Sequence, residues 1–402
     1  MFSIAAAHPT CFCWPVIRGS LLLLIAIFYL TMLNARPDFT RFNCHDSESY
    51  LALAHSLVHG CGYTRSMLED MYIPHKIWPP ALPIMMMPAI ALSGTKINWH
   101  AAKATMAIVG LIGIIAAWFL VRRVTGRPVL ADLAALLIAL SPFYWDFSHQ
   151  VMAEVPTIVW VFIALSLCDL TFAHRKPGYT VSFLVGVMCG LGLLIKGNLL
   201  GLGLAPFAHF FGLRPMRGEL RNKLVVGLLF MLGFACPFSA WALRNQTVPA
   251  TGFDGVNQVR MILQKSVMNP ELKSVPEIIQ QSYLNLRSYG IYRLPEQIIP
   301  GLWFDAAFAW PSSGLLASGL ICLIPLLLIP WKWRAHYLGL DFVILPMLAL
   351  YLPYSEGGAA RYWMPVSVTC TVLLVIRLGG QGILRKVAEC APIVLVVRFV
   401  NP

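Results

Sequence analysis

Residues 104–121 read ATMAIVGLIGIIAAWFLV and are followed at once by Arg122 and Arg123. The run contains no charged side chain, and its length approaches the roughly 20 apolar residues that an α-helix needs to cross a bilayer. Arginines that close such a run are typical of a helix that emerges at the cytoplasmic face of a membrane. The stretch therefore predicts a membrane-spanning helix whose orientation follows from its flanking charge.

Similar runs recur along most of the 402-residue chain, which has 58% hydrophobic and 12% charged residues and a mean hydropathy of +0.70. A soluble domain has roughly 25% charged residues. Apolar length predicts spans near residues 19–35, 104–121, 129–144, 155–173, 179–196, 197–213, 224–241, 312–331, 338–354 and 364–378. The tail at 387–400 is an alternative eleventh span, although Arg398 weakens that assignment. We therefore expect residues 1–402 to form one all-α, polytopic transmembrane helix bundle of about 10–11 spans.

The basic residues occur in short clusters at alternate connections between these spans. The clusters are Arg18; Arg122, Arg123 and Arg127; Arg175 and Lys176; Arg214, Arg217, Arg221 and Lys223; Lys332 and Arg334; and Arg377, Arg385 and Lys386. This pattern marks the cytoplasmic face and predicts a cytoplasmic N-terminus in a multi-pass plasma membrane protein, at the inner membrane if the source is bacterial. It also accounts for the net charge of +12, so we expect no nucleic-acid partner.

Two long connections, about 36–103 and 243–311, then lie on the external side. The first contains an apolar segment at about 79–93 that is short and carries four prolines. Counting it as a span would reverse every later loop, so we predict a re-entrant or interfacial helix. External juxtamembrane helices are therefore expected within the first long loop.

Carboxylates occur near two predicted helix starts on the external side. Asp46 opens a helix in the first loop, and Glu154 directly precedes the fourth span. Each has a structural explanation as a residue that stabilises a helix N-terminus. The functional alternative is a general base or a metal ligand. Glu48 lies two residues after Asp46 and would point to another face of the helix, so one of the two is expected to be the main base.

Cations also occur where the positive-inside bias does not expect them. Lys196 ends the fifth span, where the alternatives are a side chain that reaches the interface and a cation that holds a phosphate. Arg361, followed by Tyr362 and Trp363, begins the tenth span on the external side and is well placed for bidentate phosphate binding. Arg244 ends the seventh span on the same side. His75 precedes Trp78-Pro79-Pro80 and is either a cavity residue or part of a solvated loop.

These motifs, in this order, resemble those of polytopic (GT-C type) glycosyltransferases that use a polyprenyl-phosphate sugar, such as protein O-mannosyltransferases and lipid A aminoarabinose transferases. The resemblance covers about residues 18–376. The motifs are Asp46 with Tyr50 and Ala54, Trp78-Pro79-Pro80-Ala81-Leu82-Pro83, Arg122-Arg123, Ser141-Pro142 with Glu154, Lys196, Trp241 with Arg244-Asn245, and Arg361-Tyr362 with Pro365. One departure is Ser47, which stands at the second position of the family's usual Asp-Glu pair.

The resemblance implies a membrane glycosyltransferase that moves a sugar from a polyprenyl-phosphate donor to a hydroxyl on a glycan, lipid or protein. It implies Asp46 as the general base, with Glu154 in a supporting catalytic role. Lys196 and Arg361 would bind the lipid phosphate. Further substrate contacts are expected from Glu48, Tyr50, His75, Arg244 and Tyr362.

A lipid or solute transporter, or flippase, is the alternative function, because it too needs charges within a membrane bundle. A transferase predicts that Asp46, Glu154, Lys196 and Arg361 converge on one side, whereas a transporter predicts a polar path to both faces. No cofactor is certain, although the carboxylates leave a divalent cation open. The residues do not specify the sugar or the acceptor.

Overall fold

The computed structural model of the chain describes residues 13–35, 44–66, 72–76, 78–92, 98–211, 215–248, 263–265, 271–289, 339–354 and 360–379. The first half contains α1 (Cys13–Thr31), η1 (Met32–Ala35), α2 (Cys44–Val58), β1 (Thr64–Ser66), β2 (Tyr72–Pro74), α3 (Ala81–Ala91), α4 (Trp99–Thr125), α5 (Pro128–Ala139), α6 (Pro142–Phe147) and α7 (Glu154–Phe172). The second half contains α8 (Tyr179–Gly190), η2 (Leu191–Leu194), η3 (Gly197–Phe207), α9 (Ala208–Phe211), α10 (Leu220–Thr247), α12 (Val275–Ser288), α15 (Gly339–Tyr351) and α16 (Ala360–Gly379).

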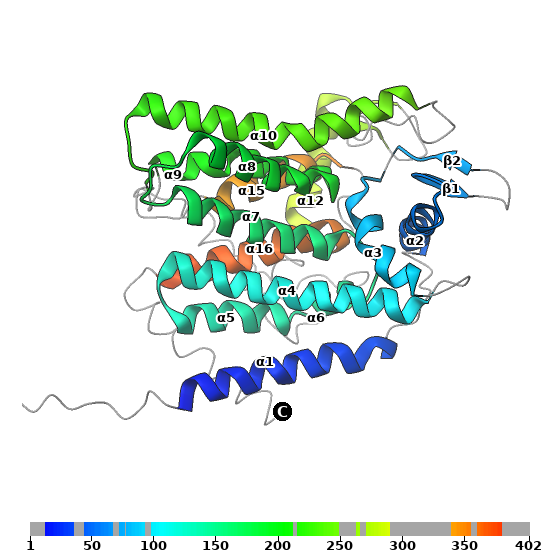
Figure 1. Cartoon of the computed structure of the whole chain (residues 1–402), viewed down its shortest axis with the longest axis horizontal. Helices are drawn as coiled ribbons and strands as arrows, with labels where there is room; N and C mark the ends of the chain where they lie inside the picture. The colour runs from blue at the N-terminus through cyan, green and yellow to red at the C-terminus, as the bar shows by residue number, and fades with distance from the viewer. Residues whose placement is uncertain are drawn as a thin grey trace, which may run out of the picture.

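The long helices run side by side in a bundle, with α1 along one edge and α10 along the other (Figure 1). Among the described residues, α4, α7 and α10 are each long and apolar enough to cross a membrane, and shorter apolar helices lie beside them. The predicted all-α polytopic bundle is confirmed. Two predicted segments, 312–331 and 387–400, lie outside the described residues.

Two spans differ locally from their prediction. The span at 129–144 is interrupted, because Ser141 starts a new short helix: its Oγ accepts a hydrogen bond from the Tyr144 N–H at 3.3 Å, and Pro142 follows it. The span at 197–213 is mostly 3-10 helix. Gly201 in that helix lies so close to the backbone of Phe342 in α15 that a Cβ at this position would clash with it.

Helices α8 and α10 approach each other through glycine. A Cβ at Gly186 or Gly190 of α8 would clash with the carbonyl oxygens of Phe230 or Phe234, and one at Gly233 of α10 would clash with Phe183. Small residues allow backbones to come this close, which is how helices pack in lipid, where the hydrophobic effect between them is absent. The outer surfaces of this pair remain apolar and exposed, as in Leu184 and Leu228.

We call the end of the bundle that carries α2, β1, β2 and α3 the loop end (Figure 1). Here β1 and β2 pair antiparallel, with Arg65 opposite Ile73. This ribbon was not predicted, since each strand has only three residues, too few for an alternating pattern to stand out. Helix α3 lies within the short helix predicted at 79–93 and packs on α2, with Leu82 and Met86 buried in the core.

The opposite end, which we call the basic end, holds the described basic clusters at the C-termini of α4 and α16 and the N-terminal side of α8 and α10. Two ion pairs tie helices together there. Arg123 of α4 lies 2.6 Å from Asp169 of α7, and Arg377 of α16 pairs with Asp341 of α15. The described members of the clusters that sequence analysis assigned to one side thus share one end of the bundle (Figure 1).

Candidate functional site

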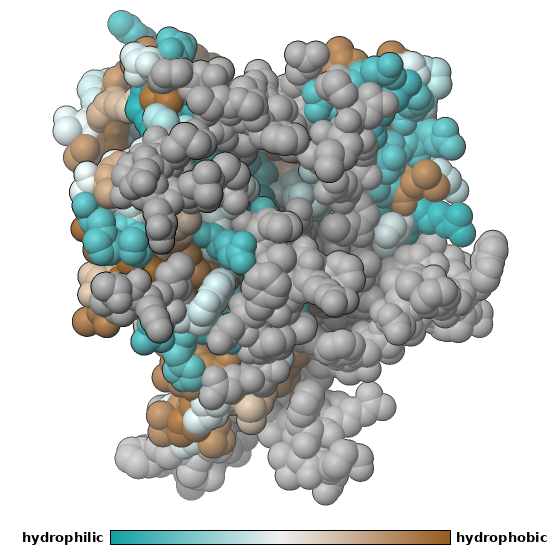
Figure 2. Space-filling model, turned by 90° about the vertical axis from the view of Figure 1, so that its right-hand side faces the viewer, coloured by the Kyte–Doolittle hydropathy of each residue, from teal (hydrophilic) through white to brown (hydrophobic). Residues whose placement is uncertain are grey.

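The loop end brings together segments that are far apart in the sequence. The Ser47 hydroxyl, in the first turn of α2, donates a hydrogen bond of 3.1 Å to the Val151 carbonyl in the connection between α6 and α7. In the same connection, a ring nitrogen of His149 lies 2.8 Å from the Tyr29 carbonyl of α1. Hydrophilic side chains gather in patches on this end (Figure 2). The start of α2, and with it Asp46, is thereby held beside the start of α7.

An ion pair at this end joins Glu154 and Lys196. Glu154 is the first residue of α7 and is buried, and one of its carboxylate oxygens lies 2.8 Å from the Lys196 ammonium. Lys196 lies between η2 and η3, where its extended backbone breaks the helical run. Burying a lone charge is costly, and a partner offsets that cost. The pair holds the Lys196 side chain in one direction, while 21% of it stays exposed.

Tyrosines and an asparagine surround this pair. The Tyr362 ring of α16 lies 5.4 Å from the Lys196 ammonium, close enough for a cation–π contact. Its hydroxyl lies 3.4 Å from that of Tyr354, which follows α15. The Asn198 amide donates a hydrogen bond to the Tyr351 hydroxyl. Four segments, α7, η2–η3, α15 and α16, therefore build one polar cluster, which we call the Lys196 cluster.

Sequence analysis singled out three of the cluster's residues, Glu154, Lys196 and Tyr362, and missed Asn198, Tyr351 and Tyr354. Asn198 lies two residues after Lys196, and the two tyrosines end a predicted span. The signal available in the sequence was that Asn198 is polar and lies at the same membrane depth as Lys196. The contact between Asn198 and Tyr351 could not be predicted, because the two residues are 153 positions apart in the sequence.

The remaining predicted residues lie at the same end. Asp46 and Glu48 are both partly exposed in the first turns of α2. Because α2 begins at Cys44, Asp46 lies inside the first turn and is not its cap. Arg361 lies in the first turn of α16, directly before Tyr362, and its side chain is outside the described residues.

A second group of predicted residues holds the first loop against α10. The Arg244 guanidinium donates hydrogen bonds to the His75 carbonyl and, at 3.2 Å, to the Tyr63 carbonyl. It also lies 5.0 Å from the Trp241 ring and 5.5 Å from the Tyr63 ring. Burial raises the pKa of Tyr63 well above its ordinary value, so this ring stays neutral. Arg244 therefore ties the β1–β2 ribbon to the end of α10.

His75 and Tyr50 meet at Trp78. The His75 ring stacks on Trp78 with centroids 4.7 Å apart, and its Nε2 accepts a hydrogen bond of 3.0 Å from the Trp78 N–H. The Tyr50 ring contacts the same indole edge-on at 5.9 Å. Both residues are buried. These contacts order the Trp78-Pro79-Pro80 segment, and a substrate role for either residue stays a prediction.

Within the described part of the chain, no group of three or more His, Cys, Asp and Glu side chains gathers as a metal site. The described site therefore consists of a buried carboxylate, a held cation, two partly exposed carboxylates and tyrosine hydroxyls. Such a set can hold an anionic group and accept a proton from a hydroxyl.

Residues 79–241 match the model of a protein family described as dolichyl-phosphate-mannose-protein mannosyltransferase. This segment includes Glu154 and Lys196, whereas Asp46, Arg244 and Arg361 lie outside it. No curated protein matches the sequence.

The fold is similar to that of solved structures at low sequence identity. ArnT from Cupriavidus metallidurans, bound to undecaprenyl phosphate, aligns with a TM-score of 0.59 and 16% identity over 96% of this chain and 64% of that chain. The archaeal oligosaccharyltransferase AglB from Archaeoglobus fulgidus, in complex with an inhibitory peptide and a dolichol-phosphate, aligns with a TM-score of 0.52 and 14% identity over 94% of this chain and 52% of that chain.

The chain thus spans less than two thirds of the length of these neighbours. The fold likeness and the family match confirm the predicted resemblance to GT-C type glycosyltransferases and agree with the predicted enzyme class.

Proposed function

We propose that this chain is a membrane glycosyltransferase that moves a sugar from a polyprenyl-phosphate donor to a hydroxyl acceptor at the loop end of the bundle. The observation that carries the proposal is the Lys196 ammonium, held 2.8 Å from Glu154 and partly exposed beside the Tyr362 ring. A cation fixed in advance stabilises negative charge without having to reorganise during the reaction.

In the proposed reaction, the acceptor hydroxyl attacks the anomeric carbon of the sugar. The bond between that carbon and the phosphate oxygen breaks, and a bond to the acceptor oxygen forms. Asp46 takes the hydroxyl proton, and polyprenyl phosphate leaves with the bonding electrons and one more negative charge. Lys196 and Arg361 bind this phosphate, while Glu154 positions Lys196.

The embedded bundle suits a lipid-linked donor. The polyprenyl tail would lie among or beside the apolar helices, with its phosphate at the depth of the Lys196 cluster. We propose that the loop end is the external face and that the basic end is cytoplasmic, as at a bacterial inner membrane, because the described basic clusters gather at the latter. The acceptor is a hydroxyl-bearing glycan, lipid or protein.

The test is transfer of radiolabelled sugar from polyprenyl-phosphate donors by the full chain reconstituted in liposomes. We expect Asp46→Asn to lower the transfer rate about 10²–10⁴-fold, since a positioned base contributes about that much. Glu48→Gln is measured in parallel, because the larger loss identifies the main base. Glu271→Gln is the control, since this carboxylate is 68% exposed in the second external loop, where it pairs with Lys265 at 3.2 Å and has no role in the proposed reaction.

Chelation by EDTA in the same assay decides whether a divalent cation takes part. Unchanged transfer by Asp46→Asn and Glu48→Gln alike would contradict the base assignment. A folded wild-type chain that turns over no donor, across several sugars and carriers, would favour the transporter alternative.

A further inference from the structure

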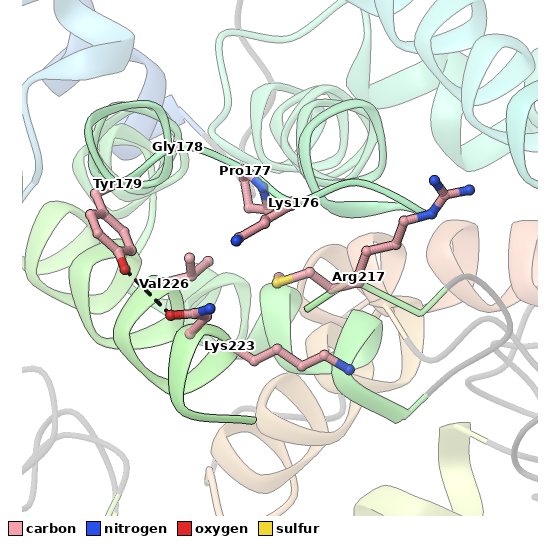
Figure 3. Close-up of a pocket in the computed structure, with 9 residues that line it drawn as sticks. Lys176, Pro177, Gly178, Tyr179, Arg217, Lys223 and Val226 are labelled. Carbon is pink, nitrogen blue, oxygen red and sulfur yellow. Dashed lines mark hydrogen bonds between the residues drawn. The ribbon is translucent and has the colours of Figure 1, made fainter. Parts of the chain in front are cut away.

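A cavity of about 320 Å³ (Figure 3) opens at the basic end of the bundle, whereas the Lys196 cluster belongs to the loop end. It lies between the connection that leads into α8 and the first turns of α10. Its lining residues are Lys176, Pro177, Gly178, Tyr179, Met216, Arg217, Asn222, Lys223 and Val226. Nothing in the proposed transfer reaction uses this cavity.

Two tied connections form its rim. The Arg217 N–H donates a hydrogen bond of 2.9 Å to the Arg175 carbonyl, and the His174 N–H donates one of 3.1 Å to the Pro215 carbonyl. Across the cavity, the Tyr179 hydroxyl of α8 lies 3.5 Å from the Asn222 side-chain oxygen of α10. The positions of the side chains around the cavity are therefore set by backbone contacts between segments about 40 residues apart.

The charge of the lining is entirely positive. Lys176, Arg217 and Lys223 come from three separate positions around the rim (Figure 3). In the part of the chain that the structure describes, no carboxylate pairs with any of the three. Gathering like charges costs free energy unless a counter-charge offsets it. The lining therefore favours an anion, and ammonium and guanidinium groups both donate well to phosphate oxygens.

The surface beside the cavity is apolar. On α8, Tyr179 and Leu184 are 52% and 54% exposed, and on α10, Leu220, Leu224 and Leu228 are 62%, 53% and 61% exposed. These residues lead from the cavity along the two helices into the region that lipid would cover. A free phosphate ion would use the cations alone, whereas a phospholipid would use both the cations and this wall.

We propose that this cavity binds the phosphate headgroup of an anionic membrane phospholipid, with the acyl chains lying along α8 and α10. Basic cavities between membrane helices at a cytoplasmic face bind such headgroups in other proteins. The lipid would bridge the two connections and the α8–α10 pair, and would stabilise the bundle without touching the transferred sugar. This proposal is independent of the proposed reaction.

The experiment measures thermal unfolding of the purified full chain in an uncharged detergent during titration with phosphatidylglycerol or with phosphatidylcholine of the same acyl chains. A third titration uses inorganic phosphate. We expect phosphatidylglycerol to raise the unfolding temperature of the wild type more than either alternative. In Lys176→Gln/Lys223→Gln, the phosphatidylglycerol concentration needed for half the effect should rise about tenfold or more.

The matched control is Arg175→Gln/Arg221→Gln, which removes two exposed charges at the same end that do not line the cavity. It should respond to phosphatidylglycerol like the wild type. An equal loss in control and cavity variants would overturn the proposal in favour of unspecific charge attraction. If inorganic phosphate raises the unfolding temperature as much as phosphatidylglycerol does, the ligand of the cavity is a free anion and the lipid proposal is overturned. If the double variant does not fold, Lys223→Gln alone serves, and an unchanged titration would then refute the site.

Discussion

Both ends of the bundle hold ion pairs, and the pairs differ in how far water reaches their cations. At the loop end, 21% of the Lys196 side chain is exposed above a Glu154 side chain that is 4% exposed. At the basic end, the Arg377 and Asp341 side chains are 5% and 9% exposed, whereas Arg123 beside Asp169 is 23% exposed. A sealed pair can only hold helices together, whereas a half-open pair offers one charge to a ligand. The difference predicts that the Arg377–Asp341 pair is structural. Exposure alone does not make a pair functional, because Arg123 is as exposed as Lys196. Lys196 is distinguished by the tyrosines around it and by the carboxylates that share the loop end.

Among the variants that test this comparison, we expect the largest effect on sugar transfer at Lys196. Lys196→Gln should lower sugar transfer about 10²–10³-fold, as the loss of a preorganised group facing transition-state charge does elsewhere. The variant also leaves Glu154 buried without its cation, which costs stability. Lys196→Gln/Glu154→Gln removes both charges and keeps amide hydrogen bonding. Transfer restored by this double variant would mean that the pair is only structural.

The next effect concerns Arg377 and Asp341. Arg377→Met leaves Asp341 as an uncompensated buried charge and should destabilise the bundle by about 3–5 kcal/mol. Arg377→Met/Asp341→Leu should recover most of this stability, since apolar groups can replace a sealed pair. Denaturation in detergent measures both variants. Transfer per folded molecule should be unchanged in the double variant, and a loss would show that the basic end takes part in the reaction.

A smaller effect is expected at Arg244, which ties the ribbon to α10 at the loop end. Arg244→Gln removes charged hydrogen bonds to the His75 and Tyr63 carbonyls and should ease local opening of the loop by about 1–3 kcal/mol. Limited proteolysis and hydrogen exchange at residues 63–76 report this opening. Unchanged protection there, together with weaker donor binding, would mean that Arg244 contacts substrate directly.

The smallest effect is expected at α12, where Ser274 and Glu277 form a capping box. Hydrogen bonds from the Ser274 N–H and hydroxyl lower the pKa of Glu277. Because the folded-state pKa is below the ordinary value, the stabilisation is present at neutral pH and is lost as pH falls through the folded-state pKa. Hydrogen exchange in α12 should therefore rise at acidic pH in the wild type, and Glu277→Gln should abolish this dependence. If exchange in the variant rises equally at acidic pH, the Glu277 carboxylate is not the cause.

The sequence could predict those residues of the candidate site whose charge lies next to or within an apolar run. Glu154 and Lys196 stood out because each adjoins or ends a long apolar run. Their direct contact was not predictable, since 42 residues separate them. His75 and Arg244 stood out for the same reason, yet their described contacts hold the first loop. Sequence context identifies a charged residue whose burial costs free energy. It does not tell whether another side chain of the protein or a bound ligand neutralises that charge.

The sequence by itself determined the helical bundle, the approximate positions of most described spans and the gathering of the described basic residues at one end. These follow from apolar length and local charge, which act over one helix at a time. Only the tertiary structure decided the Glu154–Lys196 pair, the tyrosines around it, the glycine-mediated approach of α8 to α10 and the placement of Lys176, Arg217 and Lys223 around one cavity. These depend on which helices are neighbours and at what rotation, and packing between distant segments sets both.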